Sequence, residues 1–312
     1  MSLTCGVDVG GTKIAGAIVD TDGSVLEEHR VESPATDTEA IEDAIADLVA
    51  ELRSRHEIEA VGVGAAGYIS ASRSEVMFAP NLAWRDVDLR SELEERVDVP
   101  VVIENDANAA AWGEFRFGAA ADADDLLLVT VGTGVGGGIV NDGEVFRGSF
   151  GAAAEIGHLR VVPDGRECGC GNRGCLEQYG SGTALVRSAR AEAQTPEAAA
   201  LLAAAGGDPE RITGPMITTL AQQGDPFCVA QLAEIGRWLG EGIASLAAVL
   251  DPAVVVLGGG VSDAGDLLLE PIRTAFLDQL PAREYRPEAE IRLATLGNRA
   301  GMIGAADLAR RR

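Results

Sequence analysis

The residue types best suited to binding a metal are concentrated in one segment, EIGHLRVVPDGRECGCGNRGCLEQYG. It contains His158, Cys168, Cys170 and Cys175, with the spacing His-x9-Cys-x-Cys-x4-Cys. One imidazole and three thiolates form a ligand set of tetrahedral zinc sites that leave no open position for water. The pattern therefore predicts a structural Zn²⁺ site, and a set of reduced free thiols is the alternative.

Two carboxylates flank this cluster. Glu155 lies three residues before the histidine, and Glu177 lies two residues after the last cysteine. Carboxylates accept hydrogen bonds from paired hydroxyl groups. A bound metal would hold both carboxylates and the imidazole in a rigid arrangement. We therefore expect this segment to form a surface that faces a sugar.

A second candidate group is the segment ENDAN, which follows the apolar run PVVI. If that run is a strand, Asn105 and Asp106 stand at its carboxyl end, where α/β proteins place ligands. Asp106 can accept a hydroxyl proton as a general base, and Asn105 can bond to a sugar hydroxyl. Alternatively, Asn105 or Asn108 caps the helix that follows, and the two interpretations are compatible.

Glycine-rich turns separate predicted strands at two places, DVGGTK (8–13) and GTGVGGG (132–138). Glycines between strands let backbone N–H groups approach a polyphosphate closely. Thr12 and Thr133 add hydroxyl donors, and Asp8 offers a carboxylate for hydrated Mg²⁺. Hairpin turns without a ligand are the alternative. Lys13 is the only lysine of the chain, and its position in the first turn suggests a role in binding phosphate.

The sequence also contains two matches to the dinucleotide-binding pattern G-x-G-x-x-G, at residues 62–67 and 132–137. That pattern requires a helix immediately after the glycines, because the helix N-terminus binds the pyrophosphate. Residues 68–80 show no helical periodicity, and residues 138–147 resemble a hairpin around Asp-Gly. The sequence therefore argues against dinucleotide binding.

These motifs lie in an alternation of strands and helices. We expect strands at residues 3–9, 13–20, 60–64, 100–103, 126–131 and 253–257, and helices at 37–55, 107–117, 183–206, 226–250 and 299–311. The order strand, Gly-Thr turn, strand, Asp-Gly hairpin occurs twice, which indicates a duplicated unit. With 312 residues the chain is long enough for two domains, and we expect the hinge near residues 117–124.

The amino-acid composition argues against some classes of binding partner. The net charge is −24, from 49 acidic and 25 basic residues, so the surface repels nucleic acid and anionic membranes. No apolar run approaches the roughly 20 residues of a membrane span, and no signal peptide is recognisable, so we expect a cytoplasmic protein. The acid excess with a single lysine indicates a salt-rich cytosol. A GC-rich genome would explain the loss of lysine but not the acid excess.

Taken together, the motifs resemble the ROK family of sugar kinases and repressors, within the actin/hexokinase/Hsp70 superfamily. The resemblance rests on DVGGTK (8–13), PNLAW (80–84), ENDANAAAWGE (104–114), GTGVGGG (132–138), EIGH (155–158), CGCGNRGCLE (168–177) and LGGGVS (257–262). The stretches APNLAWRDVDL and ENDANAAAWGEFRFG look most like bacterial ATP-dependent glucokinases.

This resemblance implies an α/β fold of the actin/hexokinase-like (ASKHA) type, with duplicated ribonuclease-H-like domains and an interdomain cleft. The small domain would comprise residues 1–118 with a C-terminal helix at about 299–312, and would hold the first phosphate loop and the catalytic aspartate. The large domain, residues 119–298, would hold the second phosphate loop, the zinc site and the glycines near adenosine.

The resemblance also implies roles for single residues. Asp106 would be the general base that deprotonates the sugar 6-hydroxyl. Contacts to glucose or a related hexose would come from Gly67, Asn81, Asn105, Asp106, Glu155, His158 and Glu177. ATP and Mg²⁺ would be bound by Asp8, Gly10, Gly11, Thr12, Lys13, Thr133, Gly134, Gly258, Gly259 and Gly260. Related kinases often carry another residue at the position of Lys13, so its charge would help without being essential.

Several alternatives remain open at this stage. A kinase for N-acetylglucosamine or N-acetylmannosamine would carry the same motifs, and a polyphosphate donor is conceivable. A sugar-responsive regulator without catalysis is the alternative from another class. Repressors of the family carry a DNA-binding segment ahead of the first glycine loop, whereas seven residues precede Asp8 here. Kinases of this family commonly form homodimers or homotetramers, and we expect the same here.

Overall fold

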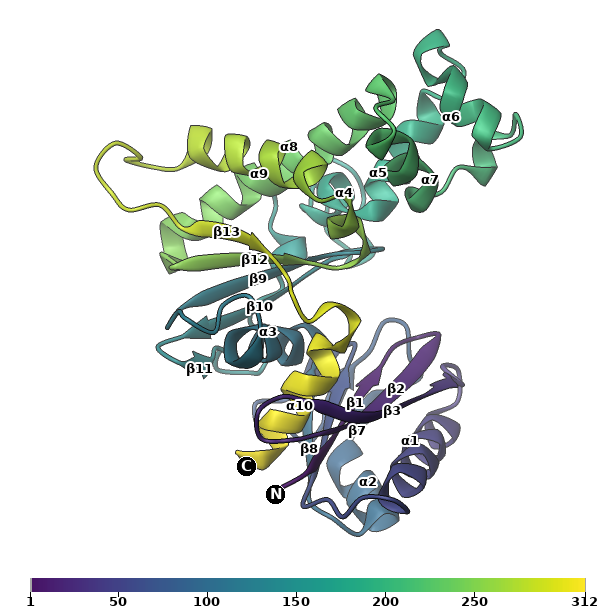
Figure 1. Cartoon of the computed structure of the whole chain (residues 1–312), viewed down its shortest axis with the longest axis vertical. Helices are drawn as coiled ribbons and strands as arrows, with labels where there is room; N and C mark the ends of the chain where they lie inside the picture. Colours follow the sequence, from purple (N-terminus) through teal and green to yellow (C-terminus); the bar gives the residue numbers. More distant parts are fainter. Residues whose placement is uncertain (1, 312) are drawn as a thin grey trace. The chain divides into compact units, whose positions relative to one another are not determined.

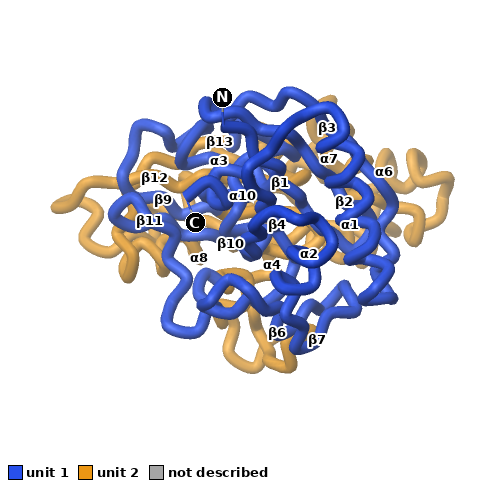
Figure 2. The backbone as a smooth tube through the Cα atoms, turned by 90° about the horizontal axis from the view of Figure 1, so that it is seen from below, with its two compact units in different colours: residues 1–128, 137–154, 294–312 blue, residues 129–136, 155–293 orange. Residues whose placement is uncertain are grey.

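The computed structural model describes residues 2–311 (Figure 1). The chain forms two compact units, which are coloured separately in Figure 2. Unit 1 comprises residues 1–128, 137–154 and 294–312, and unit 2 comprises residues 129–136 and 155–293. Compared with the domains expected from the sequence, unit 1 additionally includes residues 119–128, 137–154 and 294–298.

Unit 1 contains a five-stranded sheet with the order β3-β2-β1-β4-β8. Its strands are β1 (Thr4–Val9), β2 (Lys13–Val19), β3 (Val25–Glu32), β4 (Val61–Ala65) and β8 (Val101–Asn105). The first three strands are antiparallel neighbours, whereas β4 runs parallel to β1 and β8 runs parallel to β4. The carboxyl ends of β1 and β8 therefore lie at the same edge of the sheet, so the topology brings Asp8 and Asn105 to one edge.

Helices cover both faces of this sheet (Figure 1). Val7 and Val9 of β1 face an apolar core shared with α1 (Thr38–Arg53) and α2 (Leu89–Val97). The other face packs against α10 (Ala300–Arg310), which also contacts α3 (Asp106–Phe117). A Cβ atom at Gly6 or Gly62 would overlap a backbone carbonyl of α10, so these glycines allow the helix to approach the strands closely.

A second five-stranded sheet has the order β11-β10-β9-β12-β13. Its strands are β9 (Leu126–Val131), β10 (Val135–Asn141), β11 (Glu144–Val145), β12 (Val254–Gly258) and β13 (Glu290–Leu293). The two sheets share one topology. In each, three strands that are consecutive in the sequence lie side by side, and two strands from later in the sequence extend the sheet next to the first of them. This common topology confirms the predicted duplication. A small sheet, β5 (Tyr68–Ile69), β6 (Val76–Phe78) and β7 (Arg85–Val87), completes the strands of the described residues.

Helices make up a large part of unit 2. Its helices are α4 (Glu177–Gly180), α5 (Gly182–Ala191), α6 (Ala199–Ala204), α7 (Gly214–Gln222), α8 (Pro226–Leu250) and α9 (Asp266–Gln279). Short 3-10 turns lie at Ile156–His158, Pro196–Ala198, Pro209–Arg211 and Gly260–Ala264, and another, Gly297–Arg299, lies in unit 1. The long helices α8 and α9 pack side by side (Figure 1).

Most of the predicted elements are present, with bounds within two residues of those expected. The single helix predicted over residues 183–206 is wrong, because α5 ends at Ala191 and α6 begins at Ala199. Pro196 opens a 3-10 turn between them, and proline disfavours a helical conformation in the residue before it. Among residues 2–311, no helix has both the length and the apolar character that a membrane span needs.

Candidate functional site

The first glycine loop joins β1 to β2 in unit 1. The backbone N–H of Gly10 donates to the carbonyl of Lys13 at 3.0 Å, which closes the turn. Thr12 and Lys13 are exposed, so their side chains are available to a ligand. A Cβ atom at Gly11 would lie 3.2 Å from the backbone oxygen of Asn81, so Asn81 packs against this loop.

Asp8 and Asp106 are two carboxyl groups of unit 1 with raised pKa values. Burial raises the pKa of Asp8 to about 7, and the charge of Asp106 contributes to the shift. Burial also raises the pKa of Asp106, although a 2.9 Å hydrogen bond from the N–H of Ala107 to Oδ1 opposes the shift. A carboxylate with a raised pKa is a stronger proton acceptor, which suits Asp106 to act as a general base.

Asn105 ends β8 and caps α3, as the alternative interpretation anticipated. Its Oδ1 accepts from the N–H of Asn108 at 3.0 Å, and its Nδ2 donates to the carbonyl of Gly67 at 3.1 Å. One N–H of the amide and one lone pair remain for a further partner. The structure therefore brings together three of the predicted sugar-binding positions, Gly67, Asn105 and Asp106.

The second glycine loop lies in unit 2 between β9 and β10. The N–H of Gly182 donates to the carbonyl of Gly132 at 2.8 Å, and the hydroxyl of Thr183 donates to the carbonyl of Thr133 at 2.7 Å. These bonds fix the loop to the first turn of α5. At Gly134 the side chain of Glu177 packs so closely that a Cβ atom would overlap its carboxylate.

A cavity of about 1150 Å³ adjoins the second glycine loop within unit 2. Its walls include the loop itself, the first turn of α5, one side of α7 and the turn after β12. Lining residues outside the predicted set include Thr183, Arg190, Glu210, Thr218, Gln222 and Asp263. Nothing in the spacing of these residues marks them in the sequence, because α5, α7 and the turn after β12 meet only in the fold.

The three glycines predicted near adenosine have different environments. Gly260 lines the cavity. Gly258 is the buried last residue of β12, and Gly259 adopts a positive φ of 83°. These two residues therefore shape the turn that brings Gly260 to the cavity.

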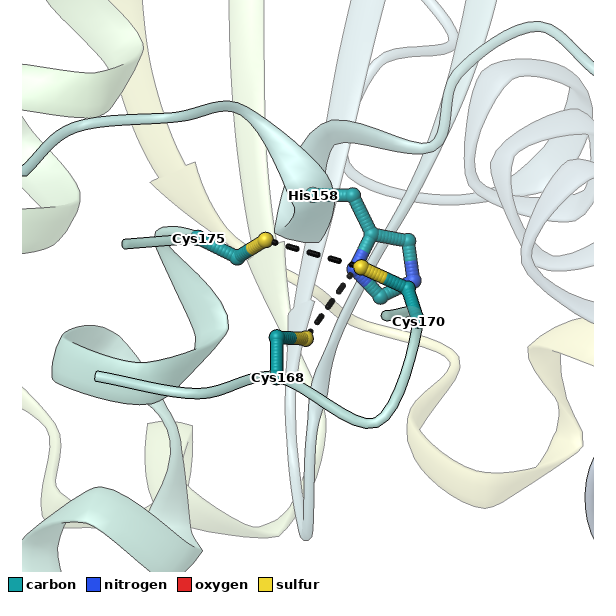
Figure 3. A group of neighbouring side chains, drawn as sticks. All are labelled: His158, Cys168, Cys170 and Cys175. Carbon is teal, nitrogen blue, oxygen red and sulfur yellow. Dashed lines mark hydrogen bonds between the residues drawn. The ribbon is translucent and has the colours of Figure 1, made fainter. Parts of the chain in front are cut away.

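The side chains of His158, Cys168, Cys170 and Cys175 converge in unit 2 (Figure 3). Their ligand atoms all lie within 4.8 Å of one another. Cys168 Sγ is 3.7 Å from His158 Nδ1, and Cys170 Sγ is 3.7 Å from Cys175 Sγ. All four thus form a candidate metal site, as their spacing predicts.

Glu155 and Glu177 both lie next to this cluster. Glu155 Oε2 is 3.9 Å from His158 Nε2, the ring nitrogen other than the one facing Cys168. Glu177 Oε1 is 4.0 Å from Cys168 Sγ, and its Oε2 accepts from the N–H of Val135 at 3.2 Å. Both carboxylates therefore lie beside the candidate metal site, and Glu177 also connects it to the second glycine loop.

The chain resembles known proteins in both sequence and structure. The chain matches the ROK family over residues 4–312. It is 53% identical to a glucokinase of Streptomyces coelicolor, over 99% of this chain and 98% of the relative. It is 30% identical to a xylose repressor of Bacillus subtilis, over 97% of this chain and 76% of the repressor.

A solved ROK glucokinase from Streptomyces griseus, in complex with glucose and AMPPNP, superimposes with a TM-score of 0.91. The two chains are 52% identical, and the match covers 100% of each. The fold is therefore the actin/hexokinase-like α/β fold that the sequence predicts. With matching motifs along nearly its whole length, the chain belongs to the ROK family.

Proposed function

We propose that this protein is an ATP-dependent glucokinase, which transfers the γ-phosphoryl group of ATP to the 6-hydroxyl of glucose. The observation that carries the proposal is Asp106, a carboxylate with a raised pKa at the N-terminus of α3. It occurs in a chain that matches glucokinases over its full length.

In the proposed reaction Asp106 accepts the proton of the 6-hydroxyl as the 6-oxygen attacks the γ-phosphorus. The bond from the γ-phosphorus to the bridging oxygen breaks, and ADP leaves with that electron pair. As the family resemblance implies, the remaining hydroxyls would be bound by Asn105, Glu155, His158 and Glu177. Most of the catalysis then comes from positioning and from stabilisation of the phosphoryl charge.

The cavity of unit 2 supports a nucleotide as the phosphoryl donor. Its volume of about 1150 Å³ is sufficient for a nucleoside, and the second glycine loop forms part of its wall. A polyphosphate chain has no group that would fill such a cavity. Asp8 has the oxygen donors that Mg²⁺ prefers. Mg²⁺, when bound, would neutralise charge on the phosphate groups.

The His–Cys cluster fits zinc. Tetrahedral ligands about 2.3 Å from Zn²⁺ lie roughly 3.8 Å apart, close to the 3.7 Å between the sulfurs of Cys170 and Cys175. The four ligands include no water position, so the metal would have a structural role. It would hold His158 and the adjoining carboxylates in place for the sugar.

A coupled assay of ADP release tests the proposal. Glucose, mannose, fructose, N-acetylglucosamine and N-acetylmannosamine would be compared at equal concentration with ATP. We expect the highest kcat/KM with glucose. A higher value with either N-acetylhexosamine would replace glucokinase by the corresponding amino-sugar kinase, and no turnover with any sugar would favour a regulator.

The cytoplasmic location, the homodimer or homotetramer and the adaptation to high salt stay predictions from the sequence. They add no step to the proposed reaction.

A further inference from the structure

We propose that Glu104 is a positioning residue for the sugar-binding and catalytic residues at the start of α3. The inference rests on the proposed function, since it assigns a role towards Asn105 and Asp106. Glu104 lies in β8, directly before these two residues. Its side chain is 3% exposed, and it accepts a hydrogen bond from the backbone of Asn105, a predicted sugar ligand.

The two oxygens of the Glu104 carboxylate have different partners. Oε1 accepts from the backbone N–H of Asn105 at 3.1 Å and from Nδ2 of Asn108 at 3.2 Å. Asn105 is the cap of α3, and Asn108 donates its own N–H to that cap. Oε1 therefore holds the backbone and the capping turn from which Asp106 projects.

Oε2 faces two arginines. Arg147 donates to it from Nε at 2.8 Å and lies within 2.7 Å through Nη2, and Arg73 Nε lies 3.5 Å away. Both nitrogens of Arg147 converge on this one oxygen, and charge-assisted hydrogen bonds of this kind are short and strong. With Oε2 held by the arginines, Oε1 is the oxygen that faces Asn105 and Asn108.

Arg147 also organises the segment that follows it. Its carbonyl accepts from the N–H of Ala153 at 3.1 Å, which closes a loop that ends at Ala154. The next residue along the chain is Glu155, a predicted sugar ligand. The carboxylate of Glu104 thus binds both the start of α3 and the loop that leads to Glu155.

Asp307 provides a matched comparison within unit 1. It is also nearly fully buried and pairs with two arginines, Arg116 at 3.3 Å and Arg310 at 2.8 Å. Its remaining partner is the indole N–H of Trp112 at 2.9 Å. None of these three partners is predicted to bind sugar or ATP. If Glu104 had only a structural role, substituting Glu104 or Asp307 would change stability and activity in the same way.

The test compares Glu104→Gln with Asp307→Asn in the full-length protein. Glutamine has one acceptor oxygen, so it can serve the Asn105 side or the Arg147 side, but not both. We expect kcat/KM for glucose to fall about 10- to 100-fold, as for a small displacement of reacting groups. KM for ATP should change less than about twofold. Asp307→Asn should lower the melting temperature and leave kcat/KM of the folded protein within about twofold.

Two further measurements keep the test decisive. Amide hydrogen exchange should quicken across residues 104–109 in Glu104→Gln and stay unchanged there in Asp307→Asn. If Glu104→Gln does not fold, Arg147→Lys serves as the second variant, because lysine keeps the charge but lacks the second nitrogen of the guanidinium. Arg147→Lys should lower kcat/KM for glucose by less than the loss expected for Glu104→Gln.

The proposal is overturned if Glu104→Gln keeps kcat/KM for glucose, or if both variants lose it equally. Unchanged exchange across residues 104–109 would overturn it as well. If the wild-type protein phosphorylates no hexose, the proposed function fails, whereas the exchange measurement still decides whether Glu104 holds this turn.

Discussion

Replacing Asp8 by asparagine should stabilise the protein above neutral pH while it impairs catalysis. The pKa of Asp8 rises from 3.8 to about 7, mainly through burial. Because the folded state holds this proton more tightly, the unfolding free energy falls as the pH rises from about 4 to about 7. The loss is complete above pH 7, where a shift of about three units corresponds to at most about 4 kcal/mol.

The experiment is urea denaturation of the wild type and of Asp8→Asn, without Mg²⁺ and nucleotide, between about pH 5 and about pH 8. Other carboxylates titrate in both proteins, so the difference between the two unfolding free energies isolates Asp8. We expect this difference to grow with pH in favour of Asp8→Asn. Asp47→Asn, at an exposed position of α1, is the control and should shift stability by less than about 0.5 kcal/mol.

The reasoning would be refuted if wild type and Asp8→Asn gave parallel stability curves across this range. A wild-type protein that was the more stable of the two at pH 8 would show the opposite sign. Either result would mean that Asp8 is ionised in the folded protein at lower cost than its surroundings indicate.

Four further outcomes are expected. Asp106→Ala should lower kcat by about 100- to 10,000-fold while calorimetry still detects glucose binding, and substantial remaining turnover would exclude it as the base. Chelation of zinc should lower the melting temperature together with activity, and an unchanged melting curve would argue against a structural metal. Lys13→Asn should raise KM for ATP a few-fold and spare kcat; a collapse to the level of Asp106→Ala would make the lysine essential. The melting temperature should rise from low to molar KCl because salt screens the surface charge, and a flat response would contradict the salt adaptation.

The parts of the site that are local in the sequence could be predicted from it. Cys168, Cys170 and Cys175 lie within eight residues, so they can converge on one metal without a specific tertiary arrangement. The two Gly-Thr turns could be recognised because strand and hairpin signals flank each of them. Asn105 is both the last residue of β8 and the N-cap of α3, and each role could be predicted from the sequence alone.

The remaining features depend on contacts between distant segments. Arg147 reaches the carboxylate of Glu104 across 43 residues, and no spacing rule links the two. The cavity of unit 2 needs α5 and α7, and the break before α6 follows from one proline within an otherwise helical composition. The raised pKa of Asp8 likewise depends on its burial and on Asp106, which the parallel order of β1, β4 and β8 brings to the same sheet edge.

The packing of α10 on the N-terminal sheet has a consequence for biosynthesis. The strands that carry Gly6 and Gly62 are made early, yet the helix that covers them consists of residues 300–310. During translation this sheet lacks one of its two covering layers until residues 300–310 have been synthesised. Unit 2, whose residues end at Leu293, can complete its own core before unit 1 can. The part of the protein that is synthesised first is therefore the part that must wait longest to fold.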